Sequence, residues 1–228
     1  MKSNLRIVRG KIKKAANKIK KNPKDINLVA VSKTFSVNHI LAAYRAGQYI
    51  FGENKIQEAL DKLELLKDYK GISFHFIGHI QSNKAKFLPK NFDLIQSVDR
   101  QKIAEIINKK AKEYGITQSI LIQVNLTKEK QKSGVYPSDL DSLIEAINKL
   151  NNLNIEGFMY IPPLKINPED NRENFRGMAE LFLQYKKPLG LKYLSMGMSQ
   201  DFEVAIEEGS NMVRIGTAIF GERNYQTN

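Results

Sequence analysis

The segment Ile26-Asn27-Leu28-Val29-Ala30-Val31-Ser32-Lys33 is the starting point for predicting the fold. A short apolar run rich in valine is typical of a buried strand. Lys33 at its C-terminal tip does not suit packing, because an unpaired ammonium is costly to remove from water and a buried lysine usually loses its charge instead. A neutral lysine amine is a nucleophile for carbonyl groups. The alternative is that Lys33 has left the strand and points to water, as most lysines do.

The same strand pattern recurs along the whole chain. Including the first, strand-like segments lie at residues 28–32, 49–51, 73–77, 94–97, 120–125, 155–160, 193–196 and 213–215. Helical patterns lie between them, at residues 37–46, 54–67, 78–87, 100–113, 137–150, 173–183 and 199–208. This alternation predicts parallel strands covered by helices, and eight strands in this length favour a closed (β/α)₈ TIM barrel. A doubly wound open sheet is the alternative, but no dinucleotide-type glycine fingerprint follows the first strand.

The composition is that of an ordinary globular protein, with 42% hydrophobic and 26% charged residues. No linker divides the chain, so we predict a single domain over residues 1–228. There is no cysteine, and the few histidines argue against a zinc site, because Gly78 interrupts the helix that a His75–His79 pair would need. No apolar stretch approaches the roughly 18 residues of a membrane span. We therefore expect a cytoplasmic protein.

Residues 1–22 predict an extra amphipathic helix before the barrel, because Leu5, Val8 and Ile12 recur at helical spacing among lysines and arginines. Such a helix can lie on an acidic membrane, but the apolar stripe is modest and favours packing on the protein itself. The net charge of +12 is compatible with an anionic partner such as nucleic acid. A lysine-rich proteome explains the charge equally well, so we expect neither a nucleic-acid nor a membrane partner.

The segments after the last two strands are candidates for a phosphate site. Barrel active sites lie at the C-terminal ends of the strands, and phosphate commonly binds after the seventh and eighth. Ser199 follows the strand at 193–196, while Gly216 and Thr217 follow the strand at 213–215. Backbone N–H groups and hydroxyls at such turns can bind phosphate, although ordinary turn chemistry explains these residues as well.

Three further side chains could complete such a site. Strand alternation places Arg214 on the same face as Gly216, so it points either at a ligand or at a carboxylate in the core. Asn54 ends the second strand and could cap a helix or contact a ligand. Together with the Lys33 amine, these groups suit a phosphorylated aldehyde. Pyridoxal 5′-phosphate (PLP) is one such molecule, and a phosphorylated sugar aldehyde is another.

Several motifs resemble those of the PLP homeostasis protein family, across residues 28–223. They are Val31-Ser32-Lys33-Thr34, Phe51-Gly52-Glu53-Asn54, Phe74-His75-Phe76-Ile77-Gly78-His79-Ile80-Gln81-Ser82-Asn83-Lys84, Gln131-Lys132-Ser133-Gly134, Leu194-Ser195-Met196-Gly197-Met198-Ser199 and Val213-Arg214-Ile215-Gly216-Thr217-Ala218-Ile219-Phe220-Gly221. The resemblance implies a barrel like the N-terminal domain of alanine racemase. It also implies a Schiff base between Lys33 and PLP, with Ser199, Gly216 and Thr217 at the phosphate, Arg214 at the pyridine nitrogen and Asn54 as a cofactor contact.

The family resemblance implies binding of PLP for vitamin B6 homeostasis without turnover, so we assign no catalytic residue. The alternatives are a PLP-dependent amino-acid racemase and a nucleic-acid or membrane binder that uses residues 1–22. Racemization needs an acid or base on each face of the substrate carbon. Alanine racemases take the second group from an added domain, which we expect to be missing because this chain ends at Asn228, although Tyr160 could replace it. We expect a monomer or weak dimer that supplies PLP to apo-enzymes.

Overall fold

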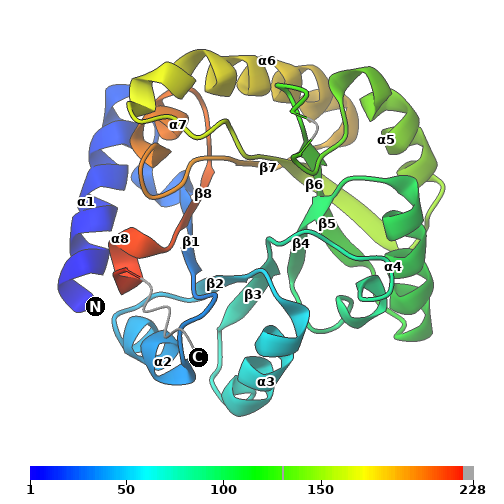
Figure 1. Cartoon of the computed structure of the whole chain (residues 1–228), viewed down its shortest axis with the longest axis horizontal. Coiled ribbons are helices and arrows are strands. Elements are labelled where there is room, and N and C mark those ends of the chain that lie inside the picture. The colour runs from blue at the N-terminus through cyan, green and yellow to red at the C-terminus, as the bar shows by residue number, and fades with distance from the viewer. Residues whose placement is uncertain (130, 223–228) are drawn as a thin grey trace.

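A computed structural model describes residues 1–129 and 131–222, so the segment ending at Asn228 lies outside the described residues. Parallel strands close into a barrel in the order of the chain, as Figure 1 shows. The strands are β1 (Asn27–Val31), β2 (Ile50–Glu53), β3 (Ser73–Phe76), β4 (Leu94–Val98), β5 (Gln118–Val124), β6 (Leu153–Tyr160), β7 (Tyr193–Ser195) and β8 (Met212–Ile215). Pairing of β1 with β8, including Val29 with Arg214, closes the barrel. The predicted (β/α)₈ barrel is confirmed, and the open sheet is excluded.

Helices surround this barrel and alternate with its strands. They are α1 (Lys2–Lys18), α2 (Val37–Arg45), α3 (Ile56–Leu66), α4 (Gln101–Glu113), α5 (Leu140–Asn148), α6 (Arg172–Leu189), α7 (Phe202–Glu207) and α8 (Thr217–Phe220). Short 3₁₀ turns are η1 (Pro23–Asp25), η2 (Ala85–Phe87), η3 (Pro137–Asp139) and η4 (Pro168–Asn171). The helix predicted over 78–87 was wrong: residues 78–81 have no regular structure, residues 82–84 form a turn, and only η2 is helical, because Ser82 and Asn83 favour turns.

Helix α6 is longer than its apolar pattern predicted. It continues past Leu183 to Leu189, with Pro188 in its last turn. Gly190 then adopts a left-handed conformation, with φ 64°, which ends the helix. Proline close to the end disrupts little of the helical hydrogen-bond ladder, so the helix tolerates it there.

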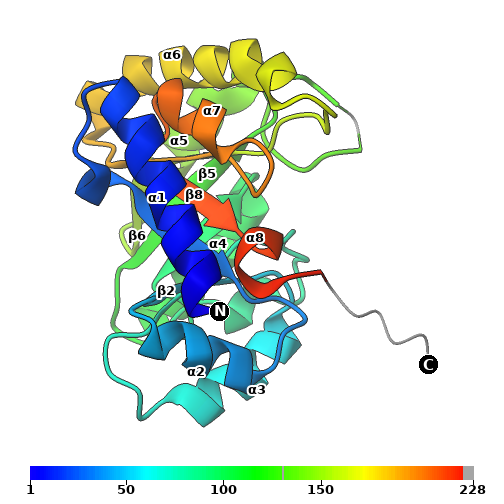
Figure 2. The ribbon, with the colours of Figure 1, turned by 90° about the vertical axis from the view of Figure 1, so that its left-hand side faces the viewer.

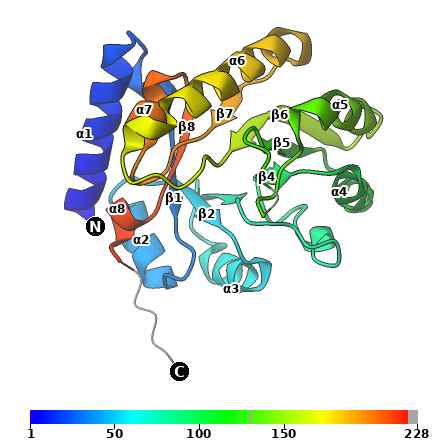
Figure 3. The same ribbon diagram turned by 45° about the horizontal axis from the view of Figure 1, so that its top comes forward.

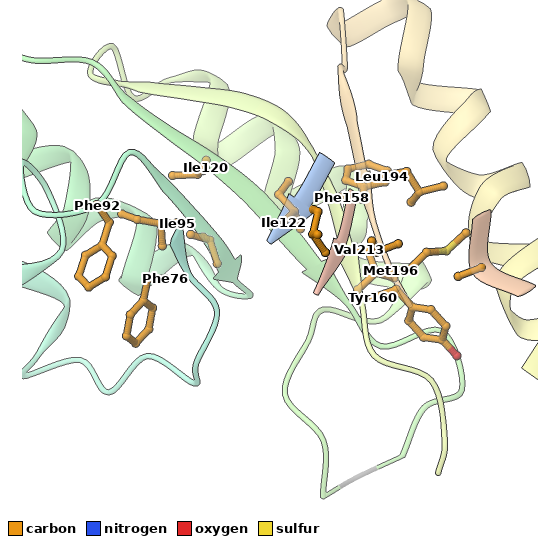
Figure 4. Packing of buried hydrophobic residues seen from close by; sticks show 14 of the residues in the cluster. Phe76, Phe92, Ile95, Ile120, Ile122, Phe158, Tyr160, Leu194, Met196 and Val213 are labelled. Atoms are coloured by element: carbon orange, nitrogen blue, oxygen red, sulfur yellow. The ribbon is translucent and has the colours of Figure 1, made fainter. Parts of the chain in front are cut away.

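The barrel has two apolar layers, one outside and one inside the sheet. Outside, strand residues such as Ile122 and Phe158 join helix residues in a continuous core, part of which Figure 4 shows. Inside, a separate cluster of five strand residues fills the barrel, made of Val29, Leu94, Leu121, Met159 and Met212. Because strand side chains alternate between faces, residues two positions further along these strands also face the interior. The interior cluster therefore forms an apolar floor below the C-terminal end of the barrel.

The N-terminal helix α1 packs on the barrel beside α7 and α8, as Figures 2 and 3 show. Its apolar stripe, including Leu5, Val8 and Ile12, is buried. Lys11 pairs with Glu203 at 3.0 Å and therefore joins α1 to α7. The stripe that could have met a membrane is thus covered by the protein itself. Within the described part of the chain, no helix is both long and apolar enough to cross a bilayer.

Candidate functional site

Four neighbouring strands carry all the predicted site residues at the C-terminal end of the barrel. In the order β7-β8-β1-β2 they are contiguous. Val31 is in register with Gly52, so Lys33 and Asn54 each lie two residues beyond a paired position on adjacent strands. Arg214 is paired with Val29 on the other side of β1. Closure of the barrel therefore brings together residues that are far apart in the sequence. Lys33 and Thr217, for example, are separated by 184 positions.

Lys33 lies in the turn that follows β1 and is half-buried. It lies two residues beyond Val31, the last residue of β1, and therefore at the C-terminal end of the barrel. Lys33 has therefore left the strand, as the second interpretation expected, but it is not fully exposed, and its chemical role stays a prediction.

The segments after β7 and β8 meet at Ser199. Its hydroxyl oxygen accepts hydrogen bonds from the backbone N–H groups of Gly216, at 3.3 Å, and Ala218, at 3.5 Å. Thr217 lies between these residues and is exposed, so its hydroxyl is accessible. A hydroxyl and backbone amides at the start of α8 are groups that bind phosphate oxygens in proteins. The structure brings the three predicted phosphate residues together.

The turn that carries Ser199 depends on Gly197 and Asp201. Gly197 has φ +94°, and a Cβ atom there would lie 2.6 Å from the Ala205 Cβ. Asp201 accepts a hydrogen bond from the backbone N–H of Met198 at 2.7 Å, which closes the turn. Burial raises the pKa of Asp201, while this hydrogen bond and the charge of Arg214 oppose the rise.

Arg214 lies inside the barrel and is only 4% exposed. Its guanidinium donates to the Ser195 hydroxyl at 2.6 Å and to the main-chain carbonyl of Tyr160 at 2.9 Å. Burial lowers the pKa of Arg214 to about 10, and the charge of Asp201 partly opposes this, so the guanidinium stays charged at neutral pH. The direct contacts of Arg214 are thus with neutral groups, and they place a cation just above the apolar floor.

A chain of hydrogen bonds runs from Arg214 across the barrel interior. Because a guanidinium only donates, Ser195 Oγ accepts from Arg214 and donates to Gln96 Oε1 at 2.6 Å. Gln96 Nε2 then donates to His75 Nδ1 at 2.9 Å, which leaves the imidazole proton on Nε2. Sequence reasoning missed this network. The sequence pattern that could have predicted it is the presence of polar residues at alternate, inward-facing strand positions, such as Gln96 two residues after Leu94.

We expect this buried histidine to make stability sensitive to acid. Burial lowers the pKa of His75 from 6.5 to about 4. Between these values the unfolded chain binds more protons than the folded one, so the free energy of unfolding falls as pH drops through this window. The His75 contribution to this loss is about 3 kcal/mol.

Denaturant titrations at pH 7 and pH 4 measure this loss, and His75→Gln should reduce it by most of that amount. The matched control His39→Gln removes an exposed histidine and should leave the pH dependence as in the unsubstituted protein. Equal pH dependence in the His75→Gln variant would contradict the assignment.

Asn54 is the least defined of the predicted site residues. Its Oδ1 atom is buried and has no hydrogen-bond partner within the described residues. Its backbone is tightly packed, because a Cβ atom on Gly78 would lie 2.2 Å from the Asn54 carbonyl oxygen. The side chain does not cap α3, whose N-cap is Lys55. An unpaired buried amide oxygen is available to a ligand that supplies a donor.

Of the other polar side chains considered from the sequence, only His75 is linked to this group, through the network from Arg214. Tyr160 is buried against Phe175 of α6, on the outer side of the sheet, and Figure 4 shows it among apolar side chains. His75 lies inside the barrel, whereas His79 contacts Ser133 in an exposed loop. Lys132 donates to Glu129 at 2.8 Å and to the Pro162 carbonyl at 2.9 Å, so it joins the loop after β5 to the segment after β6.

Taken together, the chemistry of these groups fits a phosphorylated aldehyde. A lysine amine, a cluster of hydroxyl and backbone amide groups and a buried guanidinium share one end of the barrel. Residues 2–224 match the family described as alanine racemase, N-terminal domain. Fold and site therefore define a barrel protein of the alanine racemase N-terminal class.

Individual relatives narrow this class. Proteins called pyridoxal phosphate homeostasis protein are 42% identical in Haemophilus influenzae, covering 98% of this chain and 96% of the relative, and 45% identical in Aquifex aeolicus, covering 94% and 95%. The structure of PipY from Synechococcus elongatus PCC7942 with PLP bound is 34% identical, covers 92% of this chain and 100% of that one, and superposes with a TM-score of 0.82. The chain belongs to the pyridoxal phosphate homeostasis protein family.

Proposed function

We propose that this protein binds PLP reversibly, as a Schiff base on Lys33, in vitamin B6 homeostasis. The observation that carries the proposal is that Lys33, in the turn after β1, and the Ser199–Gly216 cluster, after β7 and β8, lie at the same end of the barrel on neighbouring strands. Ser199, Gly216 and Thr217 hold the phosphate. Arg214 faces the pyridine nitrogen, and Asn54 contacts the cofactor. PLP binding by the related PipY supports the choice of ligand.

The chemistry needs only an aldehyde and the chain's own amine. Bound PLP supplies an electrophilic aldehyde carbon. The Lys33 amine would hold PLP through a reversible Schiff base to that carbon, with the aldehyde oxygen released as water, so no oxidant or reductant would be needed. Water reverses the reaction, which suits a protein that releases what it holds.

Two features favour holding PLP over turning over an amino acid. A charged Arg214 near the pyridine nitrogen disfavours protonation of that nitrogen, which makes the ring a weaker electron sink. Racemization also needs a second acid or base opposite the lysine. Tyr160 does not meet that need, because it lies on the outer face of β6 and burial raises its pKa.

The proposal also covers the location, the oligomeric state and the partners of the protein. We propose a cytoplasmic monomer or weak dimer that passes PLP to PLP-dependent apo-enzymes. The exposure of Thr217 at the C-terminal end of the barrel supports release of the ligand.

A titration of the protein with PLP, followed by assays against a panel of L-amino acids, tests the proposed function. We expect a saturable visible absorbance band of a PLP Schiff base and no inversion of any amino acid. A protein that never develops the band contradicts PLP binding. Catalytic inversion of an amino acid by the loaded protein contradicts a purely binding role and favours a racemase.

The phosphate assignment predicts a selective loss of affinity. Replacing both hydroxyls in Ser199→Ala/Thr217→Val removes donors to an anionic group, so PLP affinity should fall at least about tenfold. Affinity for pyridoxal, which has no phosphate, should change by less than about twofold. Thr117→Val, an exposed threonine at the other end of the barrel, is the control and should leave both affinities intact. Equal losses for both ligands would contradict the assignment.

A further inference from the structure

A cluster of three ionic side chains lies under α3, on the outer side of the barrel wall. Lys62 on α3 is only 6% exposed, although lysine is usually a surface residue. Its ammonium donates to Glu53 Oε1 at 2.9 Å, to Glu58 Oε1 at 2.7 Å and to the Ser32 carbonyl at 2.9 Å. An ammonium has three N–H donors, so these contacts use all of them. The Lys62 ammonium is thus fully hydrogen-bonded, whereas Glu53 Oε2 is buried without a hydrogen-bond partner among the described residues.

This cluster holds the chain on both sides of Lys33. Before it, the Ser32 hydroxyl donates to Glu53 Oε1 at 2.6 Å, and the Ser32 carbonyl accepts from Lys62. After it, the backbone N–H of Thr34 donates to Glu58 Oε1 at 2.6 Å. One ammonium therefore links the two anchors through hydrogen bonds to Glu53, Glu58 and the backbone itself.

The backbone at Thr34 is unfavourable by itself. Its φ is +68°, in the left-handed region that β-branched residues avoid. Such conformations cost on the order of 1–3 kcal/mol and persist only where the surroundings impose them. Thr34 is exposed, so side-chain packing does not impose this one. Two hydrogen bonds hold this turn: the Thr34 amide donates to the Glu58 carboxylate, and the Phe35 N–H donates to the Ser32 carbonyl at 3.0 Å.

Stability alone is a poor explanation for the cluster. Replacing a buried ion pair by well-packed apolar residues is often neutral or stabilising. A brace between α3 and the sheet could therefore be apolar, but apolar side chains cannot bind a backbone carbonyl and an amide in a fixed direction. Unlike an apolar contact, the hydrogen bonds of this cluster fix the path of the backbone through Ser32, Lys33 and Thr34.

We propose that Glu53, Glu58 and Lys62 are positioning residues, which hold the Lys33 turn so that its amine is presented to the ligand at the barrel end. This inference rests on the proposed function of Lys33. The three side chains act from outside the barrel through the backbone, and they touch neither the phosphate cluster nor Arg214.

Glu58→Ala tests the proposal with little risk to the fold, because this side chain is 28% exposed and Lys62 keeps its contacts with Glu53 and Ser32. Covalent capture of PLP, followed as growth of the visible band, should slow about tenfold because the amine is no longer held in position. Exchange of the Thr34 amide hydrogen, measured without PLP, should accelerate at least about tenfold. Glu58→Gln retains a carbonyl oxygen for the Thr34 amide and should restore most of both values.

The matched control is Glu64→Ala, which removes an exposed carboxylate from the same helix that pairs only with the exposed Lys67 among the described residues. It should leave capture and Thr34 exchange unchanged. Normal capture in Glu58→Ala, with only a lower melting temperature, would show a structural brace and overturn the inference. Absence of capture by the unsubstituted protein would overturn the proposed function itself, and the positioning role with it.

Discussion

Lys33→Ala should abolish the visible absorbance band that forms with PLP. The methyl group of alanine cannot attack an aldehyde, so no covalent bond to the chain forms at this position. PLP held by the Ser199 and Gly216 donors alone should remain weakly bound and dialysable. The measurement is an absorbance spectrum recorded after incubation with PLP and removal of the unbound ligand.

Two variants make this prediction specific. Lys33→Arg keeps a positive charge at the same position but has no nucleophilic amine, so it should lose the band as completely as alanine. Lys55→Ala removes an exposed lysine that follows Asn54 at the same barrel end, and it should keep the band. A band of normal intensity in either Lys33 variant would show that another amine reacts.

Gly157→Ala should lower the free energy of unfolding by about 3 kcal/mol or more, because it forces an atom into the main chain of the neighbouring strand. Gly157 on β6 is paired with Tyr193 on β7. A Cβ atom on Gly157 would lie 1.8 Å from the Tyr193 carbonyl oxygen. The clash is with backbone, so no side-chain rotation relieves it. Denaturant unfolding followed by circular dichroism measures the loss.

The same substitution at Gly10 provides the matched control. Gly10 lies inside α1, and a Cβ atom there has no neighbour within 4 Å. Gly10→Ala should therefore raise stability by roughly 0.5–1 kcal/mol, the usual difference between the two residues within a helix. An unfolding midpoint unchanged by Gly157→Ala would contradict the close approach of β6 and β7 in the structure.

The strands on either side of this contact also carry partners of Arg214. The Tyr160 carbonyl at the end of β6 and the Ser195 hydroxyl at the end of β7 both accept hydrogen bonds from its guanidinium. Close packing of the two strands at Gly157 thus positions the acceptors that orient a buried cation. The contact between Gly157 and Tyr193 therefore affects both the stability of the sheet and the positions of the groups that bind Arg214.

The barrel was predictable from the sequence because its signal is repetitive. Each strand is a short apolar run, and each helix has its own apolar stripe. An error in the boundary of one element therefore leaves the predicted number of strands and helices unchanged. The segment 78–87 shows the limit, since its apolar residues satisfy a helical pattern but its Gly78, Ser82 and Asn83 favour turns. In a segment this short, the turn preferences of individual residues outweighed the helical spacing of the apolar residues.

The polar contacts inside and beside the barrel were not predictable in the same way. His75, Gln96, Ser195 and Arg214 come from four different strands, and only closure of the barrel brings them into one chain of hydrogen bonds. Lys62 has the sequence environment of an ordinary surface lysine at helical spacing. Its burial depends on the exact placement of α3 against β1 and β2, which no local pattern encodes.

Reductive trapping with peptide mapping tests the central claim most directly. The protein is incubated with less than one equivalent of PLP, reduced with borohydride, digested and analysed by mass spectrometry for the phosphopyridoxyl group. We predict that one peptide carries most of the label and that the modified residue is Lys33. Label concentrated on another lysine, such as Lys132, or an unmodified Lys33 in a protein that has bound PLP, would contradict the account.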